Sequence, residues 1–293
     1  MPDRGWNANR ISHRNFTRGY NAGPWVRDRH LGKGATVYVL DTGVNLKNPG
    51  FKGSPISFGH NFVGSRGAGK TNDNDNHGHG TMCAGVIAGD RHGLSPEAAM
   101  VAVKIANDLN RSACDDVVAG IEWVLQQPGD NGMKVISMSH YGFTGLPDVS
   151  TAVGKAVDRG LHFVVCAGND GRDSCRVQPS NARGVISVGR TQDAGGREME
   201  STNIGKCITV FAPGTRVPTL SAKNIDPNYK YFSWGTSVAA PQVAALIANR
   251  LSAVGTQKPA QIRSWLQETA TKDQIEGNLQ GAPNLIAYNG IGS

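Results

Sequence analysis

The sequence lacks any long hydrophobic run. None of its apolar stretches approaches the roughly 18 residues of a membrane span, and the opening residues MPDRGWNANR hold no apolar segment of the kind found in an export signal. Internal repeats, long linkers and low-complexity tracts are also lacking. We therefore expect a soluble chain with no membrane partner, either a mature fragment or a protein that was never exported.

Cysteine is scarce and odd in number. The chain has five cysteines in 293 residues, so at least one thiol stays unpaired. Acidic residues are also fewer than basic ones, 23 against 30, which gives a formal charge of +7 and a pI near 9.3. That charge would suit a nucleic acid, an acidic surface or an alkaline-tolerant soluble protein.

Apolar residues are plentiful enough for a sizeable core. They make up 39% of the chain, so disorder is excluded, and the length fits one large α/β domain. Short β-branched or apolar runs predict six strands covered on both faces, at 36–40, 98–106, 134–139, 162–167, 184–189 and 207–212. Helical periodicity occupies 115–127, 149–157, 237–252 and 259–270. This alternation predicts a parallel sheet flanked by helices.

Three polar residues stand where such a sheet collects functional groups. Asp41 follows the first strand directly, Asn169 follows the strand HFVVC, and Ser237 opens a helix of small residues. Each also has a structural interpretation, as a turn residue (Asp41, Asn169) or a helix N-cap (Ser237). A hydroxyl at a helix N-terminus nevertheless lies beside free N–H groups, where an attacking oxygen and a new oxyanion are both stabilised.

The loop DNDNHGHGTMCAG, residues 73–85, contains two histidines. His77 and His79 with Asp73 and Asp75 could bind a metal, but no HExxH or paired Cys/His spacing completes a zinc site. The following GTMCAGVIAG indicates a small-residue helix that begins beside His79. His79 is then a candidate base, and His77 a loop residue.

Taken together, four ordered stretches make the chain resemble the subtilisin-like serine proteases, and within them the proteinase K group. They are VLDTG (39–43), HGHGTMCAG (77–85), VVCAGND (164–170) and GTSVAAPQVAALIA (235–248), and the ending GAPNLIAYN (281–289) extends the likeness nearly end to end. The resemblance implies a three-layer fold with a mostly parallel sheet of about seven strands. It also implies a single peptidase domain over 1–293, with 1–33 as a wrapping N-terminal segment and 271–293 as a tail packed on the domain.

The resemblance further implies a serine endopeptidase. Ser237 would be the nucleophile, His79 the general base and Asp41 its orienting carboxylate, and Asn169 with the Ser237 N–H would form the oxyanion hole. Peptide-bond hydrolysis would pass through an acyl-enzyme, with no cofactor in the chemistry. Because His79 must be neutral, activity should fall in acid.

Protein and peptide substrates are expected to bind by pairing with two backbone segments. The corresponding residues are Asn110, Arg111 and Ser112 in the first, and Ser139, His140, Tyr141 and Gly142 in the second. Relatives usually have Gly where this chain has Tyr141, beside the pocket for the P1 side chain. Tyr141 could narrow that pocket or turn outward.

Other departures spare the catalytic groups. Met82 stands where relatives have a second histidine, Val238 replaces a Met, Trp234 a small residue and Gln242 a His. Structural calcium is common in the family, but Thr209 stands where proteinase K has a ligand Asp, so that site is in doubt and the metal ligands are unknown.

The resemblance also predicts the cysteine pattern. Cys175 and Cys207 match a bridged pair in bacterial relatives, a disulfide that would suit a secreted enzyme. Cys83 resembles a buried free thiol beneath the catalytic histidine. Cys166 lies in a predicted core strand, and Cys114 lies near the substrate cleft.

Two alternatives to an active monomeric protease stay open. One is a catalytically impaired, protease-fold peptide-binding protein whose cleft is closed by Tyr141 and Trp234. The other is nucleic-acid binding by the N-terminal arm, in which arginines alternate with aromatic residues. We regard nucleic acid as an unlikely partner, because the arm is expected to wrap the domain; its residues are Arg4, Arg10, Arg14, Arg18, Arg27 and Arg29 with Trp6, Phe16, Tyr20 and Trp25.

Overall fold

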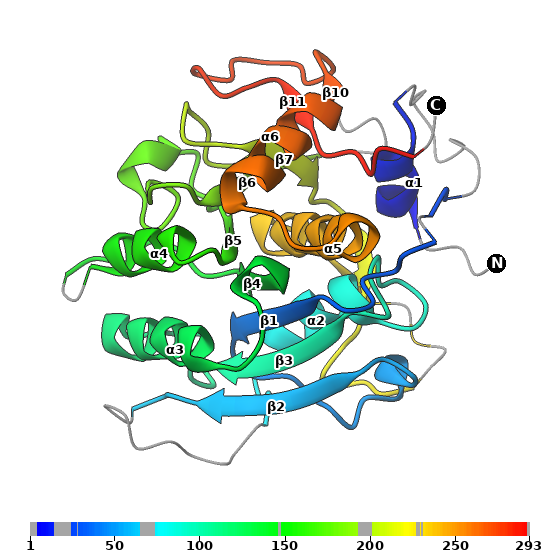
Figure 1. Cartoon of the computed structure of the whole chain (residues 1–293), viewed down its shortest axis with the longest axis vertical. Helices are drawn as coiled ribbons and strands as arrows, with labels where there is room; N and C mark the ends of the chain where they lie inside the picture. The colour runs from blue at the N-terminus through cyan, green and yellow to red at the C-terminus, as the bar shows by residue number, and fades with distance from the viewer. Residues whose placement is uncertain are drawn as a thin grey trace.

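The computed structural model describes residues 5–14, 25–27, 29–64, 74–145, 148–192, 201–226, 229 and 231–291. Its centre is a nine-stranded sheet in the order β10-β11-β7-β6-β5-β4-β1-β3-β2 (Figure 1). Neighbouring strands are parallel except for the β10–β11 pair. The strands are β1 (Thr36–Asp41), β2 (Ile56–Asn61), β3 (Ala99–Lys104), β4 (Lys134–Met138), β5 (His162–Cys166), β6 (Ile186–Thr191), β7 (Val210–Pro213), β10 (Thr271–Lys272) and β11 (Leu285–Ile286). A separate antiparallel pair is formed by β8 (Val217–Thr219) and β9 (Tyr231–Ser233).

Helices cover both faces of the sheet (Figure 1). One core, on the face covered by α3 and α4, joins Val117, Ile121 and Val153 to Phe163 of β5. The other core, on the face covered by α2 and α5, contains Val243 and Ile247. The helices are α1 (Trp6–Ser12), α2 (His79–Ala88), α3 (Cys114–Gln126), α4 (Val149–Asp158), α5 (Thr236–Val254) and α6 (Pro259–Thr269), with 3-10 turns at Pro49–Phe51, Asn131–Met133 and Ser174–Arg176. In the part of the chain that the structure describes, none of these helices has the length and apolar character to cross a membrane.

The three-layer architecture confirms the predicted fold class, and all six predicted strands are present. Edge strand β2 was not predicted, because ISFGHN has no continuous apolar run and its pairing with β3 is irregular between Phe58 and His60. The expected count of about seven strands was low, since β10 and β11 are only two residues each. These two strands belong to the predicted tail 271–293, which therefore extends the sheet at its edge.

The N-terminal segment packs against the far end of the chain. Trp6 donates its indole N–H to the carbonyl oxygen of Thr215 at 2.9 Å, and the Asn7 amide donates to Gln242 of α5 at 3.1 Å. Arg10 is fully buried and donates to the His13 carbonyl oxygen and to the Gln274 side chain. Arg10 and Trp6 are therefore not available to a nucleic acid.

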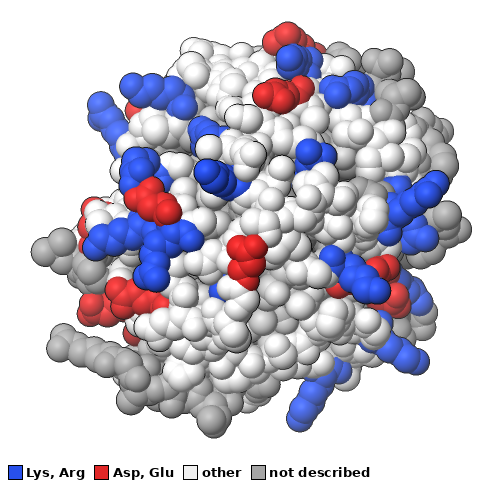
Figure 2. All heavy atoms as spheres, viewed as in Figure 1, with Lys and Arg blue, Asp and Glu red and all other residues white. Residues whose placement is uncertain are grey.

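The rest of the arm and the surface charge give nucleic-acid binding no further support. Arg4, Phe16, Arg18 and Tyr20 lie outside the described residues. On the face seen in Figure 2, Lys and Arg side chains are scattered, with acidic groups between them, and do not form one continuous basic patch.

Two long-range links stabilise the β7 side of the sheet. A disulfide connects Cys175 to Cys207, the pair expected from the resemblance. Arg263 of α6 donates through Nη1 to the Val185 carbonyl oxygen at 2.5 Å and to the Thr209 hydroxyl at 2.8 Å. Val185 directly precedes β6 and Thr209 directly precedes β7, so this guanidinium ties the starts of two neighbouring strands to α6.

We predict that Arg263→Ala lowers the free energy of unfolding by about 1–3 kcal/mol, because the Val185 carbonyl oxygen loses its charged partner inside the protein. Arg183, an exposed residue paired with Asp158, provides the matched control. Its replacement by Ala should cost less than about 1 kcal/mol. Urea denaturation of the two variants measures both changes, and equal effects would contradict the structural role given to Arg263.

Candidate active site

The candidate site lies where the strand order of the sheet reverses. From β1 the chain runs first to β2 and β3 on one side and then crosses to β4 on the other side. Asp41 is the last residue of β1, between β3 and β4. In parallel α/β sheets this crevice beyond the carboxyl ends of the strands is the usual position of a site.

Asp41 is buried and paired with His79. Its Oδ1 lies 2.7 Å from Nδ1 of His79 and accepts the Thr42 N–H at 2.8 Å. Burial by itself would raise the pKa of Asp41, but the positive charges that His79 and His140 can carry outweigh it and hold that pKa well below its usual range. Burial likewise opposes protonation of His79, yet the Asp41 carboxylate raises the pKa of His79 well above 6.5. The pair therefore consists of a fixed carboxylate and a basic imidazole.

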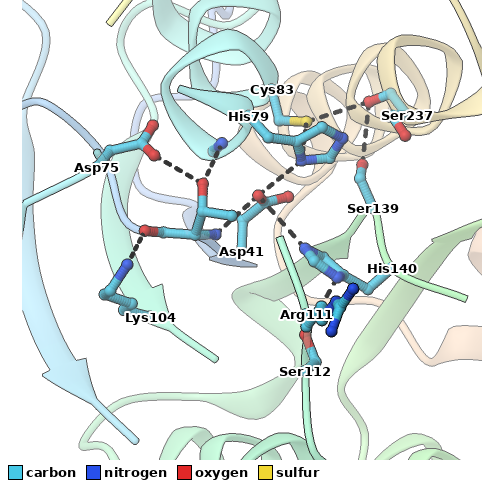
Figure 3. Close-up of polar contacts among 12 residues, drawn as sticks. Asp41, Asp75, His79, Cys83, Lys104, Arg111, Ser112, Ser139, His140 and Ser237 are labelled. Atoms are coloured by element: carbon cyan, nitrogen blue, oxygen red, sulfur yellow. Dashed lines mark hydrogen bonds and ion pairs between the residues drawn. The ribbon is translucent and has the colours of Figure 1, made fainter. Parts of the chain in front are cut away.

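Asp75 organises the turn that presents His79. Its carboxylate accepts four hydrogen bonds, from the Thr42 hydroxyl (2.7 Å), the Gly78 N–H (2.7 Å), and the N–H and hydroxyl of Thr81 (2.8 and 2.6 Å). The Thr42 hydroxyl in turn accepts the Gly80 N–H at 2.9 Å. Asp75 thus caps the N-terminus of α2 and connects it to the turn after β1 (Figure 3).

Gly80 allows this close approach. A Cβ at position 80 would lie 2.0 Å from the Gly43 carbonyl oxygen and 3.1 Å from the Asp41 Cβ. The first turn of α2 therefore touches the 41–43 turn directly, which holds the imidazole of the preceding residue against Asp41.

Ser237 is the second residue of α5 and lies beside His79 (Figure 3). Its carbonyl oxygen would normally accept the N–H of residue 241, but Pro241 has none. Cys83 Sγ (3.3 Å) and the Ser139 hydroxyl (3.0 Å) donate to that oxygen instead. Among the described residues no hydrogen bond joins the Ser237 hydroxyl to His79; such bonds are often long in free enzymes and tighten with substrate.

Asn169 is oriented by the start of the same helix. Its Oδ1 accepts both the N–H of Thr236 (2.9 Å) and the Thr236 hydroxyl (3.1 Å). This fixes the amide so that Nδ2, which donates to none of the described side chains or carbonyl groups, is left for another acceptor. The Ser237 N–H belongs to the first helical turn, where N–H groups have no intrahelical partner. Two donors are therefore available at the start of α5, where Ser237 lies.

The expected substrate segments flank this cluster, but not all their side chains face outward. Ser139 and His140 are buried: Ser139 contacts Ser237, and Nε2 of His140 lies 3.5 Å from Asp41 Oδ1. Ser112 Oγ lies 3.1 Å from Nδ1 of His140.

Other residues of the two segments form turns or stay exposed. Asn110 has a positive φ of 59°, and the Arg111 carbonyl oxygen accepts the N–H of Asn107. Tyr141 is half-buried and Gly142 exposed. Only Ser139 and His140, among the described residues of these segments, contact the Asp41, His79 and Ser237 cluster through their side chains.

The sequence raised two positions as possible cation sites, the loop with His77 and His79 and the position of Thr209. In the loop, the carboxylate oxygens of Asp75 accept hydrogen bonds from Thr42, Gly78 and Thr81, and Asp73 lies outside the described residues. At Thr209, the Arg263 guanidinium contacts the hydroxyl and the neighbouring Val185 carbonyl oxygen. That positive charge does not fit a calcium ion at the same place.

The departures from the family pattern are accommodated by packing and hydrogen bonding. Met82 is buried in a small cluster with Val217 and Val238. Gln242 donates to the carbonyl oxygens of Pro213 and Val238, and Trp234 is exposed. Cys83, Cys114 and Cys166 are free, and the sulfur of Cys83 lies 3.9 Å from Nδ1 of His79.

Sequence reasoning missed the roles of Asp75, Thr42 and His140. Asp75 was interpreted as part of a polar loop, although a carboxylate shortly before a helix start is a capping signal. His140 sits within an apolar strand end, MSHY, where a lone histidine gives no sign of its partner.

Comparison with known proteins agrees with this geometry. Residues 32–283 match the subtilase family, peptidase S8. Subtilisin-like protease 1 of Pseudogymnoascus destructans is 37% identical over 98% of this chain and 68% of that protein. A cuticle-degrading serine protease of Arthrobotrys oligospora is 38% identical over the same shares. The crystal structure of a cold adapted subtilisin-like serine proteinase superposes with a TM-score of 0.86 at 28% identity, covering 97% of each chain. The chain therefore belongs to the subtilase family of subtilisin-like serine proteases.

Proposed function

We propose that this subtilase hydrolyses peptide bonds with Ser237 as nucleophile, His79 as general base and acid, and Asp41 as the carboxylate that orients His79. One observation carries the assignment: the 2.7 Å Asp41–His79 pair lies beside a serine at a helix N-terminus, next to an asparagine whose amide is already oriented. Nucleophile, base, orienting group and oxyanion donors are the full set that acyl transfer requires.

The reaction proceeds in two halves. Ser237 Oγ attacks the substrate carbonyl carbon while its proton passes to Nε2 of His79, and the resulting oxyanion accepts hydrogen bonds from Asn169 Nδ2 and the Ser237 N–H. The C–N bond breaks as His79 returns the proton to the leaving amine. Water, deprotonated by His79, then attacks the acyl-enzyme, and the proton returns to Ser237 Oγ. Every group comes from one copy of the chain, so a monomer suffices and the chemistry uses no cofactor.

Extracellular proteins are the substrates we favour. The relative from Arthrobotrys oligospora is named for degrading cuticle, which is material outside the cell. The Cys175–Cys207 disulfide suits an oxidising compartment. Assay of secreted and intracellular fractions of the producing cell for the protein tests this location.

Ser237 should be the only residue that a serine-directed fluorophosphonate labels. Ser237→Ala should lose labelling and about 10⁶-fold in kcat, the size of the same loss in subtilisin. Intact mass spectrometry and hydrolysis of denatured casein provide the readouts, with Ser252→Ala, at a half-buried serine near the other end of α5, as the control. A wild-type protein that binds peptides but takes no label would instead be the impaired peptide-binding protein.

Activity should be lost in acid with a midpoint above pH 6.5. The reaction needs neutral His79, whose pKa is raised by Asp41 despite burial, so kcat/KM rises as pH increases through that raised pKa. Asp41→Asn removes the negative charge, so the midpoint should move to lower pH while kcat falls about 10⁴-fold. A kcat/KM profile on a peptide anilide between pH 5 and 10 tests both; a wild-type midpoint at or below 6.5 would contradict the pairing.

Tyr141 restricts the side chain accepted before the cleaved bond. A Cβ on Gly168 would lie 2.8 Å from Cδ2 and Cε2 of Tyr141, so the ring packs directly on this glycine. The Tyr141 hydroxyl lies 3.4 Å from Oδ1 of Asp170. Since Gly168 directly precedes Asn169, the ring occupies space next to the proposed oxyanion hole, and we favour small P1 residues.

Tyr141→Gly should therefore raise kcat/KM for Phe or Leu at P1, relative to Ala, by about tenfold or more, because each accommodated methylene contributes about 1–3 kcal/mol. Tyr141→Phe keeps the ring and should keep the preference for small residues. A P1-scanning peptide library measures both variants. An unchanged preference in Tyr141→Gly would mean that the ring does not wall the pocket.

A further inference from the structure

A second histidine lies against the carboxylate of Asp41. His140 follows β4 by two residues, is only 8% exposed, and places Nε2 at 3.5 Å from Asp41 Oδ1. Its ring is T-shaped to that of His79, with the ring centroids 5.6 Å apart (Figure 3). One buried carboxylate therefore has two imidazoles beside it, and the mechanism above uses only one.

Ser112 contacts the nitrogen of His140 that faces away from Asp41. The Ser112 hydroxyl lies 3.1 Å from Nδ1 of His140 and can donate to it. Nδ1 is then the acceptor, and the proton of the neutral ring is on Nε2, the nitrogen that faces Asp41. The chain Ser112, His140, Asp41 thus runs from donor to acceptor in one direction.

The Nε2 proton has no better partner. His140 Nε2 and Asp41 Oδ2 are both buried and without a hydrogen bond of good geometry to the described residues. Leaving a buried donor and a buried carboxylate oxygen unpaired is costly. Nε2 lies 3.5 Å from Asp41 Oδ1, so an N–H bond from His140 to the Asp41 carboxylate best satisfies this donor.

We propose that His140 is a positioning residue that holds the Asp41 carboxylate from a second side and weakens its hold on the proton of His79. The inference rests on the proposed function. A donor to Asp41 stabilises the negative charge, so the carboxylate attracts a proton on His79 less strongly. His79 therefore stays neutral, and able to act as the base, to a lower pH than it would if residue 140 had an apolar side chain.

Other charged or titratable groups lie around this pair, from every element packed on it. Among the described residues, only His79 and His140 come within ion-pair distance of Asp41. Lys104 of β3 is directed to the Thr42 carbonyl oxygen. The remaining groups are His77 and Asp75 in the loop before α2, Cys83 on α2, Cys166 on β5, Asp108 after β3 and Arg111 next to Ser112.

The test compares pH profiles of kcat/KM for purified wild type, His140→Leu and His140→Gln. In His140→Leu the acid midpoint should move to higher pH by about half a unit or more, which lowers kcat/KM about threefold or more on the acid side. His140→Gln keeps an N–H donor and should restore the wild-type midpoint. His162→Gln, a change at another fully buried histidine that instead bonds the Gly132 carbonyl oxygen, should leave the midpoint in place.

An unmoved midpoint in His140→Leu overturns the proposal, and so does an equal shift in His140→Leu and His140→Gln. Thermal unfolding and active-site titration establish that each variant is folded. If His140→Leu does not fold, Ser112→Ala decides, since it removes the donor that fixes the tautomer: a shift to higher pH supports the proposal and no shift overturns it. Failure of the proposed function would appear differently, as a wild-type protein without hydrolysis at any pH.

Discussion

A carboxylate buried at the end of β1 is the constraint on which the rest of the site depends. An ionised group out of water is tolerated only with partners, and Asp41 is 1% exposed. Its surroundings supply them from three directions: the Thr42 N–H, His79 on α2 and His140 after β4. The close contact at Gly80 brings α2 near enough for this pairing. The contacts that stabilise the buried charge of Asp41 therefore also fix the position of α2 and the orientation of the His79 imidazole.

Ser237 and Asn169 are each fixed through an atom that the proposed reaction does not use. The Ser237 carbonyl oxygen accepts hydrogen bonds from Cys83 and Ser139, and Asn169 Oδ1 accepts them from Thr236. Pro241 contributes by removing the N–H that would otherwise engage the Ser237 carbonyl oxygen. In the proposed reaction, the Ser237 hydroxyl, the Asn169 Nδ2 and the Ser237 N–H are the groups left to act on a substrate. Preorganised donors of this kind need no reorganisation during the reaction.

Much of this could be predicted from the sequence, and the limits have physical causes. Strands β1, β3, β4, β5, β6 and β7 are continuous apolar runs, so they were predicted; β2 is a half-buried edge strand and was not. Asp41, His79, Asn169 and Ser237 were identified from ordered motifs, each next to a strand end or helix start. Asp75 bonds mainly to Gly78 and Thr81 nearby, a local capping signal that was not used, whereas His140 lies against Asp41, far away in the sequence, and no local pattern reveals that partner. The orientation of Tyr141, left open by the sequence, depends on how its ring packs on Gly168.

The hydrogen bond between Asn7 and Gln242 joins residues 235 positions apart. Gln242 lies on α5, the helix that begins beside Ser237. Folds built on such distant contacts and on parallel strands fold slowly, because the chain loses the entropy of closing long loops before the stabilising contacts form. The four proposed reactive residues are themselves spread from position 41 to 237 on separate elements. In the proposed reaction, nucleophile and base therefore meet only when these distant segments are packed together, so hydrolysis would report on the integrity of the whole domain.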